Sequence, residues 1–163
     1  GIPDLYQGTE LWDLSLVDPD NRRPVDFDRR RRLLDELPGL SPEDILSRSD
    51  EGLPKLWVIR QALHLRRRRP RDFGPEGAYR PLAARGPRAA HAVAFRRGDG
   101  AVTVVPRLVL GLGGDWAGTT LELPDGRWFN VLTGDGQASG TVPLRELLAR
   151  FPVGLLERKE AGP

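Results

Sequence analysis

The sequence changes character near residue 78, and this change constrains the fold more than any other feature. From Tyr79 onward, short runs of β-prone residues alternate with turn-forming residues. The clearest pair is Ala92–Phe95 and Ala101–Val105, which flank Gly98-Asp99-Gly100 and predict a β-hairpin. Further runs of this kind are Leu108–Leu110, Thr119–Leu123, Trp128–Leu132, Thr141–Pro143 and Val153–Leu156. A turn is expected at Pro124-Asp125-Gly126, and a short helix over Leu144–Arg150. This spacing predicts an antiparallel β-sandwich over residues 78–163.

Alternation along the expected strands predicts which side chains form the core. One face of each strand must be covered, so the apolar residues of that face should be buried. The residues expected to be largely buried are Val93, Phe95, Val102, Val104, Leu121, Leu123, Val131 and Leu155. Trp116, Trp128 and Phe129 are interpreted as packing residues, with a sugar-stacking surface as the alternative.

Residues 1–77 have the pattern of loops and helices. We expect Asp28 to cap a helix over Arg29–Leu37 and Ser41 to cap a second helix that begins at Pro42. A third helix should begin at Pro54 and end near Arg69, with Leu56, Ile59 and Leu63 on one apolar face. Asp4–Tyr6 could close a buried strand that begins further upstream. These helices lack a sheet of their own, so we expect them to pack on one supplied by a longer protein.

The segment before the first helix is a stiff loop rich in charged and aromatic residues. Pro19 and Pro24 fix φ on both sides of its most charged part. Carboxylates and guanidinium groups bind pairs of sugar hydroxyls, and aromatic faces cover the apolar side of a pyranose. The candidate sugar-binding residues are Asp18, Asp20, Arg22, Arg23, Tyr6 and Trp12. The alternative is a surface turn with internal Asp–Arg pairs.

Composition excludes several classes of site. The chain has no cysteine, which excludes disulfides, thiolate metal sites and a cysteine nucleophile. No apolar stretch approaches the length of a membrane span. The absence of methionine from all 163 residues predicts that the chain is a piece of a longer protein.

Two further kinds of ligand are weighed and set aside. Asp18 and Asp20 have the spacing of a calcium loop, but an EF-hand would then need Gly and Glu where Arg23 and Arg29 stand. Two runs of four arginines, Arg29–Arg32 and Arg66–Arg69, would favour phosphate binding, yet they lack interleaved aromatic residues and are interpreted as solvated faces. We therefore expect no metal, no nucleic acid and no membrane partner.

A resemblance to a known family covers most of the chain. Gly1–Glu10 (GIPDLYQGTE) resembles the segment around the eighth barrel strand of the α-amylase superfamily, Gly-x-Pro followed by Tyr-x-Gly-x-Glu. Leu11–Phe27 (LWDLSLVDPDNRRPVDF) resembles, more specifically, the maltooligosyltrehalose synthase family. The likeness continues in order through Lys55–Trp57, Leu65–Arg67, Val104–Leu108, Leu132–Gly134 and Phe151–Val153.

This resemblance implies a cytoplasmic enzyme that converts the reducing-end α-1,4 linkage of a maltooligosaccharide into an α,α-1,1 linkage. The reaction is an intramolecular glucosyl transfer with retention and without a cofactor. Glycoside chemistry with retention needs two carboxylates roughly 5–5.5 Å apart. The resemblance places those groups before Gly1, so no catalytic residue is assigned to this chain, and the fragment alone is expected to be inactive.

The expected architecture is an α+β fragment of two parts. Residues 1–77 would be the end of a catalytic (β/α)8 barrel, comprising the last strand, the substrate loop and helices, and residues 78–163 a C-terminal antiparallel β-sandwich. Two alternatives stay open at this point. The chain could be a non-catalytic carbohydrate-binding β-sandwich module, or part of another glycosidase or transglycosidase of the α-amylase superfamily.

Overall fold

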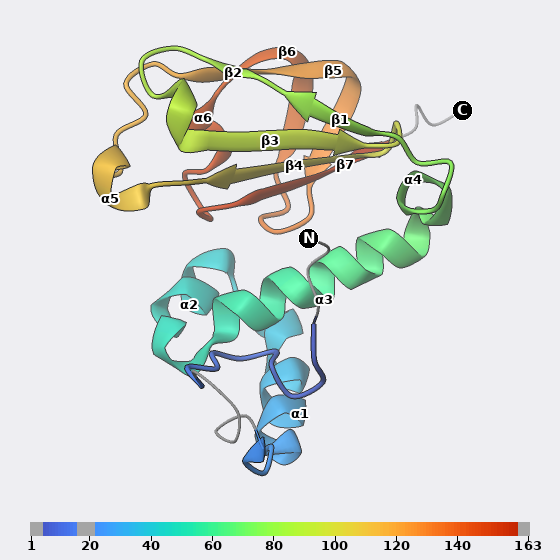
Figure 1. The fold of residues 1–163 in the computed structure, drawn as a ribbon, viewed down its shortest axis with the longest axis vertical. Helices are drawn as coiled ribbons and strands as arrows, with labels where there is room; N and C mark the ends of the chain where they lie inside the picture. Colours follow the sequence, from blue (N-terminus) through green and yellow to red (C-terminus); the bar gives the residue numbers. More distant parts are fainter. Residues whose placement is uncertain (1–4, 16–21, 160–163) are drawn as a thin grey trace. The chain divides into compact units, whose positions relative to one another are not determined.

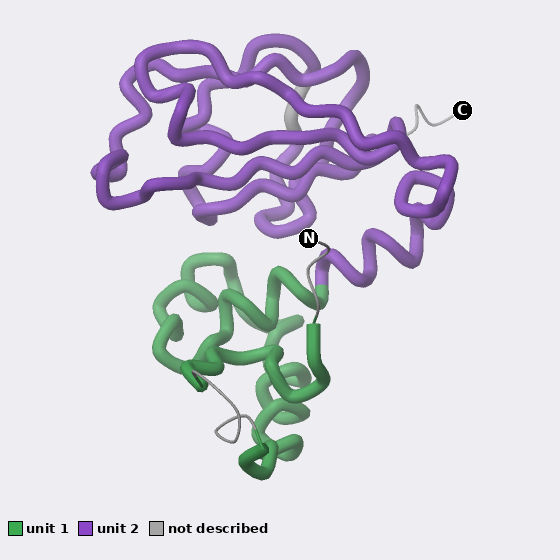
Figure 2. The backbone as a smooth tube through the Cα atoms, viewed as in Figure 1, with its two compact units in different colours: residues 1–60 green, residues 61–163 purple. Residues whose placement is uncertain are grey.

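The computed structural model describes residues 5–15 and 22–159, apart from the side chains of residues 137 and 138. It divides into two compact units, Gly1–Arg60 and Gln61–Pro163 (Figure 2). The boundary falls inside helix α3 (Leu53–Arg68), whereas the predicted boundary at residues 77/78 follows the change in secondary structure. Residues 61–77 therefore belong to the same compact unit as the sheet. The assignment of residues 1–77 to a catalytic barrel stays a prediction.

The described part of the first unit is helical, as the sequence predicted. Its elements are α1 (Phe27–Glu36), η2 (Leu37–Gly39), α2 (Pro42–Ser47), η3 (Ser49–Glu51) and the first half of α3 (Figure 1). The capping prediction for α2 is confirmed, because the Ser41 hydroxyl accepts from the Asp44 N–H while the Asp44 carboxylate accepts from the Ser41 N–H. The predicted cap of α1 is wrong. Asp26, not Asp28, caps this helix and accepts from Arg29 N at 2.8 Å, because the helix begins earlier, at Phe27.

Apolar side chains from these helices and from the segment before α1 form the core of the first unit. The buried residues are Leu11, Leu33, Leu37, Ile45, Leu53 and Leu56. The predicted face of α3 is only partly correct, because Leu56 is buried but Leu63 is exposed. The strand expected at Asp4–Tyr6 is not present at Leu5 and Tyr6, and residues 1–4 lie outside the described part of the chain.

The described part of the second unit contains one antiparallel sheet of seven strands. The strands are β1 (Tyr79–Leu82), β2 (Ala84–Arg85), β3 (Ala92–Arg97), β4 (Ala101–Pro106), β5 (Thr120–Asn130), β6 (Gly136–Pro143) and β7 (Gly154–Lys159). They pair in the order β1-β3-β4-β7-β5-β2, with β6 on β5 (Figure 1). Only Ala83 separates β1 from β2, although these strands stand at opposite ends of that order. The sheet must therefore curl until its two ends nearly meet.

This arrangement confirms the α+β class and the antiparallel sheet. The predicted sandwich is not confirmed, because the described strands form one hydrogen-bonded, curled sheet. The predicted hairpin is confirmed as β3 and β4, which pair across Gly98–Gly100. Short helical turns complete the unit: α4 (Pro70–Phe73), η4 (Ala89–His91), α5 (Val109–Leu112) and α6 (Leu144–Leu147).

The register of the hairpin corrects part of the predicted core. Ala94 lies opposite Val104, and Phe95 lies opposite Thr103. Because paired residues point to the same face, Val104 shares its face with Ala94 and not with Phe95. Val93 is accordingly 39% exposed and Phe95 is half-buried, so their assignment to the core is wrong. The other six predicted core residues are buried.

Two local predictions were also wrong. Pro124–Gly126 is not a turn between strands but an irregularity inside β5, where the register with β6 shifts between Leu123 and Arg127. Leu108–Leu110 is not a strand, since Val109 begins the short helix α5. An apolar run of three residues does not distinguish a strand from a helical turn by its period.

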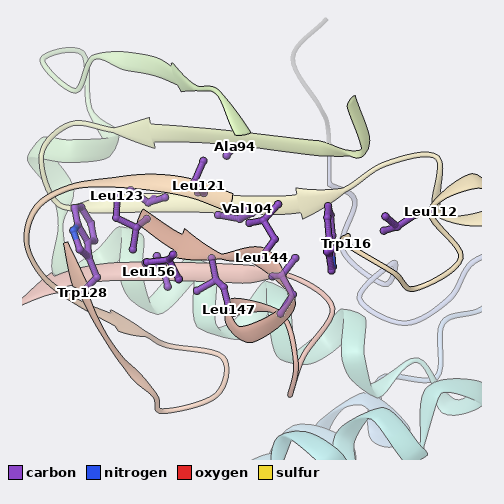
Figure 3. Packing of buried hydrophobic residues seen from close by; sticks show 13 residues of the cluster. Ala94, Val104, Leu112, Trp116, Leu121, Leu123, Trp128, Leu144, Leu147 and Leu156 are labelled. Atoms are coloured by element: carbon purple, nitrogen blue, oxygen red, sulfur yellow. The ribbon is translucent and has the colours of Figure 1, made fainter. Parts of the chain in front are cut away.

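The curled sheet encloses a continuous hydrophobic core. The labelled side chains in Figure 3 come from β3, β4, β5, β7, α5, α6 and the α5–β5 connection. Trp116 and Trp128 belong to this core, which confirms their interpretation as packing residues. The indole N–H of Trp128 is satisfied, because it donates to the Pro124 carbonyl at 2.9 Å.

The end of α3 joins the same unit through polar contacts with the sheet. The Gln61 side-chain amide donates to Val131 O at 2.9 Å. Arg68 Nη2 donates to Glu157 Oε2 at 2.8 Å, and Arg69 Nε lies 3.4 Å from Glu157 Oε1. Burial alone would raise the pKa of Glu157, but the hydrogen bonds and charges of the two arginines outweigh it and leave the pKa lowered. Glu157 is therefore a buried carboxylate that stays ionised.

Candidate functional site

A cleft of about 730 Å³ in the first unit contains the predicted sugar-binding segment. Its walls come from residues 6–9 and 12–15 on one side and residues 23–26 and Arg30 on the other. Tyr6 and Trp12 line it with exposed rings, at 70% and 53% exposure respectively. The cleft thus offers aromatic surface, backbone groups and the charges of Asp13, Asp26, Arg23 and Arg30 to a ligand.

Arg30 connects the two walls of this cleft. Its Nε donates to Glu10 Oε2 at 3.0 Å, its Nη2 donates to the Gly8 carbonyl, and its Nη1 donates to Asp26 O at 3.1 Å. Gly8 and Glu10 belong to the first wall segment, whereas Asp26 belongs to the second. A single planar guanidinium therefore holds both segments in fixed positions.

Glu10 completes this connection. Both of its carboxylate oxygens accept from the Gly8 N–H, at 3.0 and 3.1 Å. Burial would raise its pKa, but the Gly8 backbone bond and Arg30 prevail and lower it. The Glu10 carboxylate therefore holds its own backbone segment against Arg30.

Gly8 is needed where the first segment turns. Its φ is +97°, a conformation that favours glycine, and an added Cβ would lie 2.7 Å from Val25 Cγ2. The adjacent turn is closed by Thr9 N, which donates to Tyr6 O at 3.1 Å. The backbone of residues 6–9 can therefore approach the second wall closely enough to form the cleft.

Trp12 is held at one edge while its ring stays exposed. Its indole N–H donates to Ser49 O at 2.5 Å, and Lys55 Nζ lies 5.9 Å from the ring centroid. The same Lys55 Nζ donates to Leu11 O at 2.9 Å. Because one edge is anchored, the ring presents a fixed face, which is what stacking on a sugar requires.

Three of the six predicted site residues are brought together. Tyr6, Trp12 and Arg23 line one cleft, while Arg22 is exposed and does not line it. Asp18 and Asp20 lie outside the described residues. The sequence reasoning missed Arg30, which is hidden in the run Arg29–Arg32. The sequence did hold one indication of its role. Arg30 stands four residues after the cap Asp26, and residues four apart lie on the same face of a helix.

The two arginine runs also make intramolecular contacts. In the first run Arg30 faces the cleft and Arg31 pairs with Asp28 at 2.6 Å. In the second, Arg68 and Arg69 pair with Glu157.

Among residues 5–15 and 22–159, no group of three or more His, Asp or Glu side chains is placed to hold a metal ion. Within those same ranges no helix has both the length and the apolar character needed to cross a membrane.

Sequence comparison gives a relative that matches the chain along its whole length. No known family profile matches. A protein of Mycobacterium tuberculosis named as a maltooligosyl trehalose synthase is 49% identical over 162 residues, which is 99% of this chain and 19% of the relative. The chain thus spans about a fifth of the length of the curated relatives it matches.

Solved structures agree with this match. The maltooligosyltrehalose synthase of Arthrobacter ramosus is 43% identical with a TM-score of 0.83, over 98% of this chain and 20% of that protein. A protein described as DSM5389 glycosyltrehalose synthase is 28% identical with a TM-score of 0.67, over 98% of this chain and 18% of its own. Both the fold and the sequence correspond to the C-terminal part of the enzyme. The chain therefore belongs, as a segment of about one fifth of their length, to the maltooligosyltrehalose synthases.

Proposed function

We propose that this chain is part of an enzyme that converts the reducing-end α-1,4 linkage of maltooligosaccharides into an α,α-1,1 linkage by intramolecular glucosyl transfer. The observation that carries the proposal is 49% identity across 99% of the chain to a relative named for this activity. The first unit would be the end of the catalytic barrel, and the carboxylates that break the glycosidic bond would lie outside the chain. The fragment alone would then be inactive.

The cleft of the first unit is proposed to hold the glucose released in the first half of the reaction. That glucose must reorient and attack again before it escapes and before water reacts in its place. Tyr6 and Trp12 would cover the apolar face of the ring, and the guanidinium of Arg23 would donate to adjacent hydroxyls. Asp18, Asp20 and Arg22, close to Arg23 in sequence, are proposed to contribute further hydroxyl contacts.

The proposed position of the cleft fits the known behaviour of barrel enzymes. Their active sites are built from the loops that follow the strands at the carboxyl-terminal face. In the proposed barrel, the segment that contains residues 5–15 and 22–26 would follow the last strand as such a loop. The bracing by Arg30 supports this role, because a loop that excludes water must be held in one conformation.

Single Ala substitutions in a full-length enzyme that carries this segment test the proposal. Tyr6→Ala, Trp12→Ala and Arg23→Ala, then Asp18→Ala, Asp20→Ala and Arg22→Ala, would be assayed on maltopentaose for trehalose-end formation and glucose release. Loss of a glucose contact should raise glucose release relative to transfer. Arg31→Ala, on the exposed side of α1, is the matched control and should keep the original ratio. Unchanged rate and ratio in all six variants would contradict the proposed role of the loop.

The isolated chain gives a separate test. Incubated with maltopentaose, it should form no trehalose ends above a buffer blank, because the paired carboxylates are absent. Turnover by the purified chain would overturn the placement of the catalytic groups.

A further inference from the structure

The sheet-bearing unit has a second cavity, of about 450 Å³, that is lined by four cationic side chains. Arg127 and Lys159 come from β5 and β7, Arg158 from β7, and Arg69 from the segment that follows α3. The cavity also has backbone at Gly100 and Gly126 and two acidic residues, Asp72 and Asp99, at its wall. It shares no residue with the sugar cleft, and its role is independent of the proposed enzyme activity.

The strand register places like charges against each other at this cavity. Arg127 lies directly opposite Lys159, and the next pair is Trp128 with Arg158. Like charges at directly opposed positions of an antiparallel pair destabilise the sheet. A sheet that keeps Arg127 directly opposite Lys159 carries a cost that a bound anion would remove.

The bulge in β5 makes room for this arrangement. Gly126 has a φ of +132°, and a Cβ at this position would lie 2.7 Å from Arg158 Nε. Any other residue would displace the guanidinium. Arg127 then resumes the pairing of the strand beyond the bulge. The glycine therefore lets Arg158 approach the backbone beside Arg127.

Two of the three acidic residues near the cavity are paired with arginines, and the third, Asp72, accepts from a backbone N–H. Asp99 pairs with Arg96 at 3.1 Å, and Asp72 Oδ1 accepts from Asp99 N at 2.9 Å. Glu157 pairs with Arg68 and Arg69. Among the described residues, Arg127 and Arg158 form no ion pair with a carboxylate.

We propose that this cavity binds a phosphate group, either as inorganic phosphate or as the phosphate ester of a small metabolite. Two guanidinium groups can donate paired N–H bonds to phosphate oxygens, and the Lys159 ammonium adds a point charge. The cavity volume exceeds that of a bare phosphate and lies within the range of small-molecule sites, so an organic group on the ester oxygen can be accommodated.

The test uses the whole 163-residue chain and titration calorimetry in low-salt, phosphate-free buffer. Inorganic phosphate, glucose 1-phosphate and uncharged glucose are the three probes. We expect saturable binding of both phosphates and none of glucose. Equal affinity for the two phosphates would assign the site to the phosphate group alone, and at least tenfold tighter binding of the sugar phosphate would assign it to an ester.

Arg127→Gln and Lys159→Gln should each weaken phosphate binding at least tenfold. Arg145→Gln is the matched control, because Arg145 is exposed and its contact with Glu146 is long, at 3.8 Å; it should change affinity less than twofold. Loss of binding in the control as well would identify non-specific charge attraction. Absence of saturable phosphate binding to the original chain would overturn the proposal. Tighter binding of a short oligonucleotide than of either phosphate, at physiological salt, would also overturn it.

Thermal unfolding distinguishes a lost site from a lost fold. Arg127→Gln removes one of two opposed cations. In phosphate-free buffer its thermal-unfolding midpoint should therefore equal or exceed that of the original chain. Phosphate should then raise the midpoint of the original chain and of Arg145→Gln, but not that of Arg127→Gln. A phosphate-induced shift that persists in Arg127→Gln would contradict the assignment.

Discussion

Arg30 Nε lies 3.0 Å from Glu10 Oε2. Through this contact α1 holds the segment around Glu10, which stands twenty residues before Arg30 in the sequence. Both side chains are largely buried, and the same guanidinium also bonds the Gly8 and Asp26 carbonyls. The charge pair thus fixes backbone as well as side chains. Its removal should affect the cleft before it affects the rest of the unit.

Arg30→Met should lower the free energy of unfolding by about 2 kcal/mol, because it removes the charged donor from the Glu10 carboxylate and from the Gly8 and Asp26 carbonyls. The control is Arg31→Met on the same helix. The pair of Arg31 with Asp28 is exposed on both sides, so its loss should cost about 0.5 kcal/mol or less. Urea denaturation of both variants measures the difference. Equal losses of stability would show that the contact of Arg30 with Glu10 stabilises the unit no more than the exposed pair does.

The charge of Glu157 predicts how stability depends on pH. Its pKa is lowered in the folded chain, so it stabilises the fold above the ordinary glutamate pKa of about 4.3. That contribution should disappear as the pH falls through the lowered pKa. Glu157→Gln should therefore cost about 2 kcal/mol at pH 7, a value reduced for the partial exposure of Arg68, and progressively less below pH 4.

Guanidinium denaturation at a series of pH values measures this dependence. Glu146→Gln is the control, because its pair with Arg145 is exposed, and its effect should be small at every pH. A cost for Glu157→Gln that stays constant from pH 7 to pH 3 would show that the charge is not involved.

The two faces of β3 can be distinguished by adjacent substitutions. Ala94→Leu inserts volume into the closed core opposite Val104 and should destabilise by about 1–3 kcal/mol. Val93→Leu enlarges a side chain on the exposed face and should change stability by about 0.5 kcal/mol at most. Thermal or urea unfolding gives both values. The reverse order would mean that the register of β3 is offset by one residue.

The cap of α1 gives a similar comparison. Asp26→Ala removes the side chain that accepts from Arg29 N and should cost about 1 kcal/mol. Asp28→Ala removes a first-turn acid with one exposed ion pair and should cost about half as much or less. Circular dichroism during urea unfolding measures both changes. A larger loss of stability for Asp28→Ala than for Asp26→Ala would indicate that Asp28 is the cap.

Local chemistry explains what the sequence predicted well. The Ser41–Asp44 capping box and the Gly98–Gly100 hairpin depend on neighbouring residues, and both are present as expected. Register and strand extent depend on partners distant in sequence. Nothing near Val93 indicates that Ala94 will face Val104, and nothing near Gly126 indicates that β5 continues through it. Local sequence specifies turns, while the choice of face is made by packing.

The candidate site divides in the same way. Tyr6, Trp12 and Arg23 were found because aromatic and charged residues are close together in sequence. Arg30 was missed because its three neighbours in the run are also arginines, and only the fold distinguishes the one that turns inward. The cavity lined by Arg69, Arg127, Arg158 and Lys159 was missed because these cations come from segments that are distant in sequence.

The place of β7 in the sheet has a consequence for how this chain is made. β7 is the last of the described strands in sequence order, yet it pairs with both β4 and β5. At a synthesis rate of roughly 5–20 residues per second, β4 waits roughly 3–10 s after its own completion for this neighbour. During that interval the edge of β4 carries unpaired backbone groups, and Val102 and Val104 lack their cover. A newly made chain is thus open to pairing with other extended chains until β7 has emerged from the ribosome.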